Sequence, residues 1–394
     1  MERKEIEKVC EQFDTPCYVF DLDILKNRVE LIKEELGSEV SVCYAMKANP
    51  FVIKPMNDYI CKYEVCSPGE YEICHRAGIP SDKIVVSGVN KTNASMTRIM
   101  ELCKGKGVFT LESPSHYEIL SKVCREMNTP IRVLLRLSSG NQFGMDKETL
   151  ENVLSMVIND PNMEPAGIHF YSGTQKKQKK IAKELAMLEE YGHYLNDRFG
   201  IKLEELEYGP GLSVTYFEAD EPIDAVQELK GLRDLLGGIT AFSHVTVEMG
   251  RFIATECGYY FTSVMDVKKT DGVNYCIVDG GIHQLNYYGQ IMGMKKPVMQ
   301  LITESSTEEV PWNICGSLCT VNDVILKGAM FPELKAGDCF VFENCGAYSV
   351  TEGMALFLSR ELPQIIFYSA KDGFLVARKP METNLINSIM EEEE

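Results

Sequence analysis

Several residues that could hold a phosphate-bearing cofactor stand at the ends of short apolar runs in this sequence. Lys47 directly follows one run and Glu248 ends another, while His169 lies inside a third. A glycine-containing turn, Gly209-Pro210-Gly211, follows a fourth run. The N–H groups of a glycine turn suit an anion, and a lysine, a histidine and a carboxylate beside such a turn are what a phosphate-bearing cofactor would require. Together these residues indicate a site for a phosphate-bearing cofactor.

The elements that must position these residues alternate between strands and helices. Helices are expected over Leu25–Leu36 and after Ser67-Pro68 and Ser113-Pro114, since serine followed by proline commonly opens a helix. Eight β-rich runs lie between helical stretches, at 40–46, 63–66, 84–87, 108–111, 131–137, 166–170, 203–208 and 244–248. Eight such units over roughly 220 residues predict a (β/α)₈ barrel, with a doubly wound open sheet as the alternative.

A barrel gathers function at the C-terminal ends of its strands. Lys47, Glu70, Arg136, His169, the glycine turn and Glu248 would all lie there. Beyond Arg251 the helical periodicity gives way to β-rich runs separated by turns, and 16–20 reads as an early strand. We therefore predict an N-terminal strand segment at 1–24 that joins the β domain. A cofactor-binding barrel at 25–250 follows, and then a β-rich, sandwich-like or barrel-like domain at 251–394 with an acidic tail.

Composition narrows the classes of partner. The net charge of −18 argues against nucleic acid, which selects basic surfaces. No apolar run approaches the roughly 20 residues of a membrane span, and the first residues lack the apolar core of a signal peptide, so we expect a cytoplasmic protein without membrane contact. The basic run at 176–180 is interpreted as a solvated helix start, in preference to a site for an acidic or phosphorylated partner.

The fourteen cysteines do not indicate a metal site. None occurs as C-x-x-C, and only six histidines could assist them. Several lie in apolar runs, where free cysteine behaves as a small hydrophobe: Cys43, Cys103, Cys124, Cys276 and Cys339. We expect reduced thiols and no metal.

Six segments, in order along the chain, resemble signatures of the fold type III pyridoxal-phosphate-dependent decarboxylases, the group of diaminopimelate and ornithine decarboxylases. They are Tyr44-Ala45-Met46-Lys47-Ala48-Asn49, Glu64–Glu70, Gly167–Gln175, Glu248-Met249-Gly250-Arg251, Gly316–Asp323 and Cys345-Gly346-Ala347-Tyr348. The resemblance extends from Thr15 to Pro363. It implies pyridoxal 5'-phosphate as cofactor, an alanine-racemase-like barrel and decarboxylase activity.

The same resemblance implies a role for each matching residue. Lys47 would carry the cofactor as a Schiff base, His169 would stack on its ring, and Glu248 would keep the ring nitrogen protonated. The remaining cofactor-binding positions, mostly at the phosphate, are Arg136, Ser172, Gly209, Gly211, Gly250, Arg251 and Tyr348. Pro210 departs from the usual triple glycine and supplies no N–H, so one phosphate contact would be lost or replaced by Gly211.

Two residues of the β-rich domain would act in a second subunit. By resemblance, Cys319 would protonate the carbon left after carbon dioxide departs, and Asp323 would lie near the distal group of the substrate. The enzyme would then be a homodimer with shared active sites.

The substrate is less well indicated. Thr320 stands where diaminopimelate decarboxylases carry glutamate, and the segment His283–Tyr288 lacks their arginine. Both departures favour the specialised branch that acts on carrier-tethered glutamyl groups or siderophore precursors, so the substrate would be a small molecule or a carrier-tethered amino acid. Diaminopimelate and basic amino acids, including D-forms, stay open. Glu248 and Cys319 disfavour an amino-acid racemase, whereas Pro210 keeps a non-catalytic homologue open.

Overall fold

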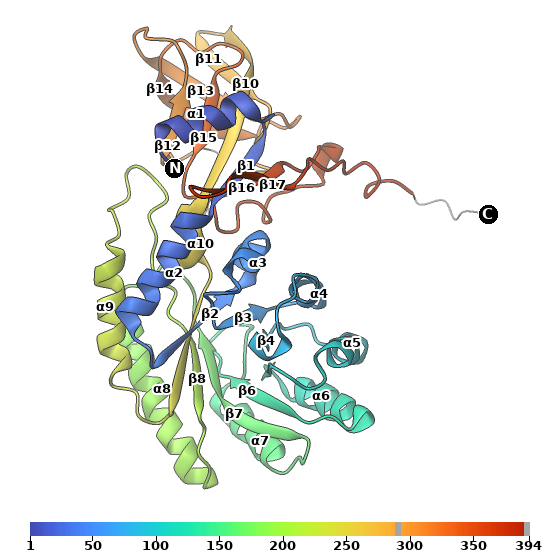
Figure 1. The fold of residues 1–394 in the computed structure, drawn as a ribbon. Coiled ribbons are helices and arrows are strands. Elements are labelled where there is room, and N and C mark those ends of the chain that lie inside the picture. Colours follow the sequence, from blue (N-terminus) through green and yellow to red (C-terminus); the bar gives the residue numbers. More distant parts are fainter. Residues whose placement is uncertain (288–292, 390–394) are drawn as a thin grey trace, which may run out of the picture. The chain divides into compact units, whose positions relative to one another are not determined.

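A computed structural model describes residues 1–287 and 293–389 of the chain (Figure 1). The chain forms two compact units. The barrel unit comprises Lys26–Val214 and Ile223–Ile253, and the β unit comprises Met1–Leu25, Thr215–Pro222 and the chain from Ala254 onward. Residues 215–222, placed in the barrel domain from the sequence, thus belong to the β unit. The boundaries at 24/25 and 250/251 stay a prediction, and the acidic tail at 391–394 lies outside the described residues.

The barrel unit is a closed barrel of eight parallel strands, which confirms the predicted fold class. Its closure is made by β2 and β9, where Val40 pairs with Val245 and Cys43 with Glu248. The strands correspond to the eight predicted runs within a few residues at each end: β2 (Val40–Ala45), β3 (Lys62–Val65), β4 (Ile84–Val86), β5 (Val108–Leu111), β6 (Ile131–Arg136), β7 (Met163–Tyr171), β8 (Glu205–Gly209) and β9 (His244–Met249).

Helices follow most of these strands and cover the outside of the barrel (Figure 1). The two serine-proline starts are confirmed, since the Ser67 side chain accepts a hydrogen bond from Glu70 N and that of Ser113 from His116 N. The helices are α2 (Leu22–Leu36), α3 (Ile53–Met56), α4 (Pro68–Arg76), α5 (Asn93–Cys103), α6 (Pro114–Met127), α7 (Lys147–Ile158), α8 (Gln178–Phe199), α9 (Ala225–Leu236) and α10 (Arg251–Ala254).

The β unit is built on a mixed sheet in which the early strand β1 (Cys17–Asp21) is central. This strand pairs antiparallel with β10 (Gly258–Thr270) and parallel with β16 (Gln364–Ser369). Helix α1 (Arg3–Gln12) buries Ile6 and Val9 in the same core cluster as strand residues such as Val19 and Phe261. The other strands are β11 (Val273–Val278), β12 (Met299–Ile302), β13 (Val310–Cys315), β14 (Val324–Phe331), β15 (Cys339–Phe342) and β17 (Gly373–Arg378).

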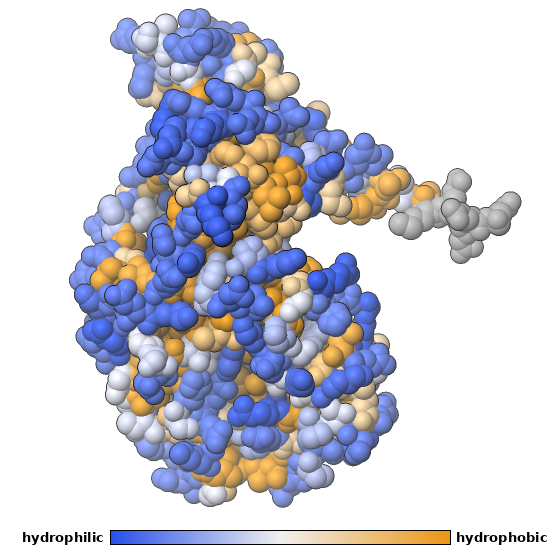
Figure 2. Space-filling model, in the orientation of Figure 1, coloured by the Kyte–Doolittle hydropathy of each residue, from blue (hydrophilic) through white to orange (hydrophobic). Residues whose placement is uncertain are grey.

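The surface and the cysteines agree with ordinary globular packing. The face shown in Figure 2 is mainly hydrophilic, with apolar residues in separate patches. The five cysteines expected in apolar surroundings are buried and free. In the described part of the chain, no helix combines the length and apolarity that a membrane crossing requires.

Candidate active site

Lys47 lies at the centre of a charged cluster at the C-terminal ends of the barrel strands. It stands in a short 3₁₀ turn, Met46–Ala48, directly after β2. Its Nζ lies 2.7 Å from Glu64 Oε2 and 3.7 Å from Glu248 Oε1. Both carboxylates are buried, whereas 36% of the lysine side chain is exposed. The amine is therefore held in place by two buried charges and can still be reached by a small molecule.

Glu248 and His169 form a buried pair beside this lysine. Glu248 lies near the C-terminal end of β9, and its Oε2 lies 3.0 Å from His169 Nε2 on β7. Burial alone would raise the pKa of Glu248, but the Lys47 ammonium and the His169 hydrogen bond outweigh it and hold that pKa well below its ordinary value. Glu248 is therefore an anion at neutral pH. His169 Nδ1 is buried and has no hydrogen-bond partner within the described residues.

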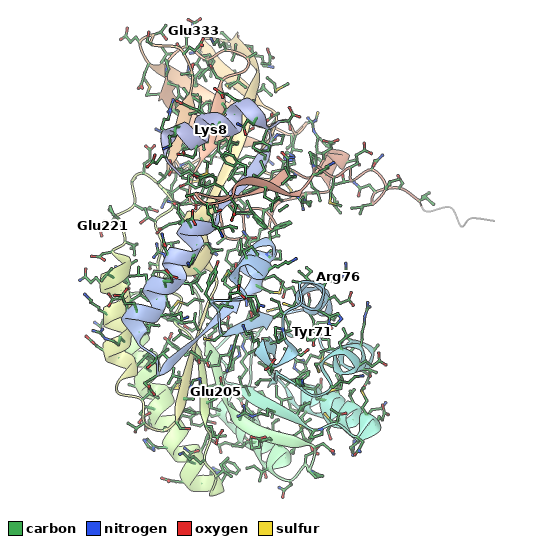
Figure 3. All side chains as sticks on the ribbon, viewed as in Figure 1. Lys8, Tyr71, Arg76, Glu205, Glu221 and Glu333 are labelled. Atoms are coloured by element: carbon green, nitrogen blue, oxygen red, sulfur yellow. The ribbon has the colours of Figure 1, made fainter. Side chains whose placement is uncertain are left out.

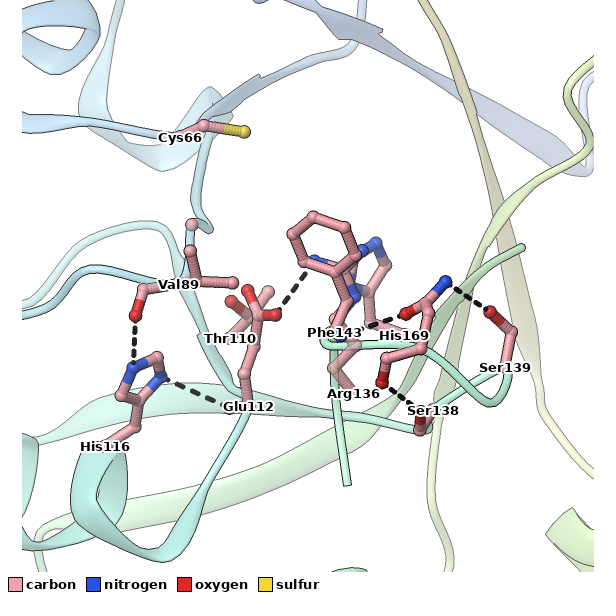
Figure 4. Close-up of polar contacts among 12 residues, drawn as sticks. Cys66, Val89, Thr110, Glu112, His116, Arg136, Ser138, Ser139, Phe143 and His169 are labelled. Atoms are coloured by element: carbon pink, nitrogen blue, oxygen red, sulfur yellow. Dashed lines mark hydrogen bonds and ion pairs between the residues drawn. The ribbon is translucent and has the colours of Figure 1, made fainter. Parts of the chain in front are cut away.

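Arg136 at the end of β6 is held by contacts that the sequence did not indicate. Its Nη1 donates to Glu112 Oε2 at 3.0 Å, and its guanidinium lies 5.0 Å from the centre of the Phe143 ring. Glu112 N donates in turn to Nδ1 of His116, whose Nε2 lies 3.1 Å from Val89 O. Figure 4 shows the hydrogen bonds among Arg136, Glu112, His116 and Val89 as dashed lines. Glu112 therefore balances the charge of the Arg136 guanidinium and fixes its orientation.

The glycines of the predicted phosphate site are sterically required. A Cβ on Gly250 would lie 2.9 Å from Ala48 Cβ and 3.1 Å from Ala45 O. Gly211 has φ +58°, and a Cβ there would lie 2.2 Å from Gly173 O. Larger residues at either position would push these segments apart, so the backbone forms a tight cradle of the kind that suits a phosphate.

Ser172 and Lys176 differ from their predicted roles. The Ser172 hydroxyl donates to Glu184 Oε1. Because a serine carries one O–H proton, this hydroxyl has none left to donate to a phosphate in this arrangement. Lys176 was expected in a solvated run, yet it is buried and its Nζ lies 2.7 Å from Glu184 Oε2. The other three lysines of the run behave as expected, because Lys177, Lys179 and Lys180 are exposed.

A buried acid, Glu207 on β8, lies close to the pair of His169 and Glu248. Ligand atoms of His169, Glu207 and Glu248 all lie within 4.8 Å of one another. Three such groups could hold a metal ion. Because the Lys47 ammonium already balances the charge of Glu248, we assign no metal here. The absence of a metal from this protein stays a prediction. Both carboxylate oxygens of Glu207 lack hydrogen-bond partners in the described part of the chain, and burial raises its pKa well above the ordinary value. Glu207 therefore keeps its proton to a higher pH than an ordinary glutamate does.

Glu207 should make the stability of the protein fall as the pH rises. The folded state keeps this proton while the unfolded state loses it above the ordinary pKa of 4.5, so folding is opposed by about 1.4 kcal/mol for each further pH unit, up to the raised pKa. Glu207→Gln removes that dependence. We expect urea unfolding at pH 5.5 and 7.5 to show the variant gaining stability relative to wild type at the higher pH. A stability difference that does not change with pH would contradict the protonated state.

Other ionisable residues of the barrel were also missed from the sequence. Lys62 lies between Glu205, labelled in Figure 3, and Thr246, whose Oγ1 is 3.2 Å from Lys62 Nζ. Lys91 is buried, its Nζ lies 2.7 Å from Gly88 O, and burial lowers its pKa to about 8. Glu64 could have been recognised as a site residue from the sequence, because a charged side chain inside a predicted buried strand requires a partner. Lys91 lies in a loop and gave no such signal.

Three predicted site residues belong to the β unit. Cys319 is an exposed free thiol. Asp323 is 2% exposed, and its two oxygens accept hydrogen bonds from Ile282 N at 2.9 Å and Leu318 N at 2.8 Å. Its carboxylate therefore fixes the turn that carries Cys319, and these contacts count against the predicted role near the substrate's distal group. Tyr348 has φ +68°, and its predicted phosphate contact stays a prediction.

Comparisons with known proteins identify the family of this chain. A family model described as "Pyridoxal-dependent decarboxylase, pyridoxal binding domain" matches residues 22–255. An L-glutamyl-[BtrI acyl-carrier protein] decarboxylase from Niallia circulans is 25% identical, over 100% of this chain and 98% of that protein. Diaminopimelate decarboxylase from Helicobacter pylori is 28% identical, over 87% of each chain.

A further relative and a solved structure extend the likeness. A 2-[(L-alanin-3-ylcarbamoyl)methyl]-2-hydroxybutanedioate decarboxylase from Staphylococcus aureus is 25% identical over 92% of this chain and 96% of that protein. The crystal structure of Helicobacter pylori diaminopimelate decarboxylase complexed with L-lysine superposes with a TM-score of 0.85, at 24% identity, over 97% of this chain and 98% of that one. This chain belongs to the diaminopimelate and ornithine decarboxylase family and is a pyridoxal-phosphate-dependent carboxy-lyase.

Proposed function

We propose that this enzyme removes the α-carboxylate of an amino-acid-derived substrate and that Lys47 is the residue to which the cofactor attaches. The observation that carries the assignment is the position of Lys47 Nζ, between the buried carboxylates of Glu64 and Glu248 at the mouth of the barrel. Both can stabilise the ammonium at rest, and a lysine held in this way is suited to nucleophilic attack once it loses its proton.

The residues present fit pyridoxal phosphate. A reachable amine, an anionic carboxylate, a buried His169 Nδ1 without a hydrogen-bond partner among the described residues, and a close-fitting glycine cradle offer what its aldehyde, ring and phosphate require. Lys47, Arg136, His169 and Glu248 would hold the aldehyde and the ring. Gly209, Gly211, Gly250, Arg251 and Tyr348 would hold the phosphate. When bound, the cofactor supplies an electron sink for the electron pair that remains when carbon dioxide leaves.

Each residue then has a distinct task. Glu248, kept ionised, holds a proton on the ring nitrogen, and the hydrogen bond from His169 fixes the carboxylate in position. The Cys319 thiol donates a proton to the α-carbon, so that one proton is taken up for each carbon dioxide released. Glu64 accepts a hydrogen bond from Lys47 and keeps the amine aimed into the mouth of the barrel.

For the substrate we propose a carrier-tethered glutamyl group or a related siderophore precursor. The exposed loop at 319–322 offers only neutral side chains after Cys319, and Asp323 turns inward to its own backbone. A substrate with a charged distal ammonium would find no carboxylate in this loop. The full-length likeness to the Niallia circulans enzyme supports the same class. Diaminopimelate is the second candidate, because the Helicobacter pylori relative acts on it.

Carbon dioxide release by the cofactor-loaded enzyme tests this proposal. The panel holds a carrier protein bearing an L-glutamyl group, meso-diaminopimelate, and the L- and D-forms of lysine and ornithine. We expect release from the carrier-bound substrate and little from diaminopimelate. Rapid release from diaminopimelate would overturn the substrate proposal while keeping the decarboxylase, and release from lysine or ornithine would name a different substrate.

We also propose a homodimer in which Cys319 of one subunit serves Lys47 of the other. Lys47→Ala and Cys319→Ala homodimers should each have low activity, with the loss at Cys319 on the order of 10²-fold, as for removal of a general acid. After the two variants are mixed and exchange subunits, each heterodimer regains one intact site. The mixture should then recover about a quarter of wild-type activity, since half of the dimers are heterodimers with one working site. Recovery of none, despite exchange verified by mass spectrometry, would place both residues in one subunit's site.

A further inference from the structure

Lys176 joins the predicted phosphate-binding turn, Gly209–Gly211, to the loop that follows β7. It follows the loop after β7, and its backbone N donates to Gly211 O at 2.9 Å, in the turn after β8. Lys176 and Leu212 form a parallel β-bridge at the same point. The loop at 172–175 and the glycine turn are therefore held side by side by the backbone of Lys176.

The side chain of Lys176 adds four polar contacts. Its Nζ lies 2.7 Å from Glu184 Oε2, 2.9 Å from Gly209 O, 3.3 Å from Ser172 Oγ and 3.5 Å from the Tyr208 hydroxyl. These groups come from α8, from β8 and from the loop after β7. Because Lys176 is 3% exposed, its ammonium depends on these partners instead of water.

Glu184 is equally saturated. Its Oε2 accepts from the Tyr208 hydroxyl at 2.7 Å as well as from Lys176, and its Oε1 accepts from Ser172. Burial alone would raise the pKa of Glu184, but the hydrogen bonds from Lys176, Ser172 and Tyr208 outweigh it and lower that pKa. The carboxylate is therefore an anion. Lys176 and Glu184 hydrogen-bond to each other and to the surrounding segments, through Ser172, Tyr208 and Gly209.

The Gly209–Gly211 turn depends on contacts that fix its backbone orientation. Pro210 offers no N–H, so phosphate binding there depends on where the remaining backbone groups point. Gly211 is in the left-handed region, and a Cβ on it would lie 3.0 Å from Lys176 Cε. The Lys176 side chain therefore packs against Gly211, whose backbone N–H is one of those left in the turn to bind a phosphate.

We propose that Lys176 and Glu184 form a buried clamp that fixes the Gly209–Gly211 turn against the loop at 172–175, which makes Lys176 a positioning residue for the cofactor's phosphate. This inference rests on the proposed function, because it takes the Gly209–Gly211 turn as the phosphate site. The clamp contacts neither the Lys47 amine nor the pair of His169 and Glu248. Its loss should therefore weaken phosphate binding without changing how the rest of the cofactor is recognised.

The test compares two ligands that differ only in the phosphate. Apoenzyme of wild type and Lys176→Met is titrated with pyridoxal 5'-phosphate and with pyridoxal, followed by the change in cofactor absorbance. We expect the variant to bind pyridoxal 5'-phosphate more weakly by about tenfold or more, the factor for one charged hydrogen-bonding contact. Affinity for pyridoxal should be nearly unchanged. Lys180→Met is the matched control, because Lys180 is an exposed lysine 3.9 Å from the same Glu184.

A second variant distinguishes loss of the clamp from loss of the fold. Lys176→Met leaves Glu184 as a buried charge without its cation, whereas Lys176→Met with Glu184→Gln leaves no such charge. A thermal unfolding transition verifies that the double variant is folded. Equal losses for both ligands, or no loss for either, would overturn the clamp. Failure of the wild-type apoenzyme to bind pyridoxal 5'-phosphate would instead overturn the proposed cofactor site itself.

Discussion

Lys47→Ala is expected to abolish decarboxylation and covalent attachment of the cofactor. The loss of carbon dioxide release should be on the order of 10³-fold or more, because in the proposed site this amine alone forms the link to the aldehyde. Borohydride reduction followed by mass measurement should find the cofactor on wild-type Lys47 and on no residue of the variant. Retained attachment in Lys47→Ala would overturn the assignment.

Lys47→Arg separates chemistry from charge. It keeps a cation beside Glu64 and Glu248, whereas alanine leaves those buried carboxylates facing each other at the mouth of the barrel. The guanidinium does not form the link to an aldehyde, since it stays protonated. We expect Lys47→Arg to be more stable to urea than Lys47→Ala but equally inactive.

Glu248→Gln is expected to lower kcat by on the order of 10²–10³-fold while the cofactor stays attached to Lys47. The amide keeps the shape of the side chain and a hydrogen-bonding group near His169 Nε2, but it removes the buried negative charge that would hold a proton on the ring nitrogen. Steady-state kinetics and the cofactor absorbance of the purified variant measure the two effects separately.

Glu207→Gln provides the matched comparison. Glu207 is also a buried acid and lies within the same cluster, but burial raises its pKa well above the ordinary value, so it carries less negative charge than Glu248. Removing its acidity should therefore change kcat far less than the same substitution at Glu248. Equal losses in the two variants would show that the activity depends on the shape and packing of the barrel interior, and not on the charge of Glu248.

The architecture of the barrel unit was predictable because its signals are local. Apolar runs, serine-proline helix starts and the order of the motifs all lie within short stretches of chain, and all eight strands were found within a few residues of their ends. Beyond Arg251 the sequence indicated β10, β11, β12, β15 and β16, whereas helix α1 and strands β13, β14 and β17 were not predicted. In α1 only one face is apolar and the rest is charged, so its burial of Ile6 and Val9 depends on the sheet beneath it.

The candidate site was predictable only in part, because residue type does not say which partner a charge will meet. The motifs identified Lys47, His169 and Glu248, and each lies at or near the C-terminal end of a strand, where a barrel gathers function. Lys47 pairs with Glu64 and Glu248, and His169 pairs with Glu248, so these contacts join residues as far apart in the chain as Lys47 and Glu248. Lys176 looked like one more lysine in a solvated run, and Asp323 looked like a substrate ligand. Folding buries both, and a buried charge takes its partners from whatever the surrounding strands and loops present: Glu184 for Lys176, and backbone N–H groups for Asp323.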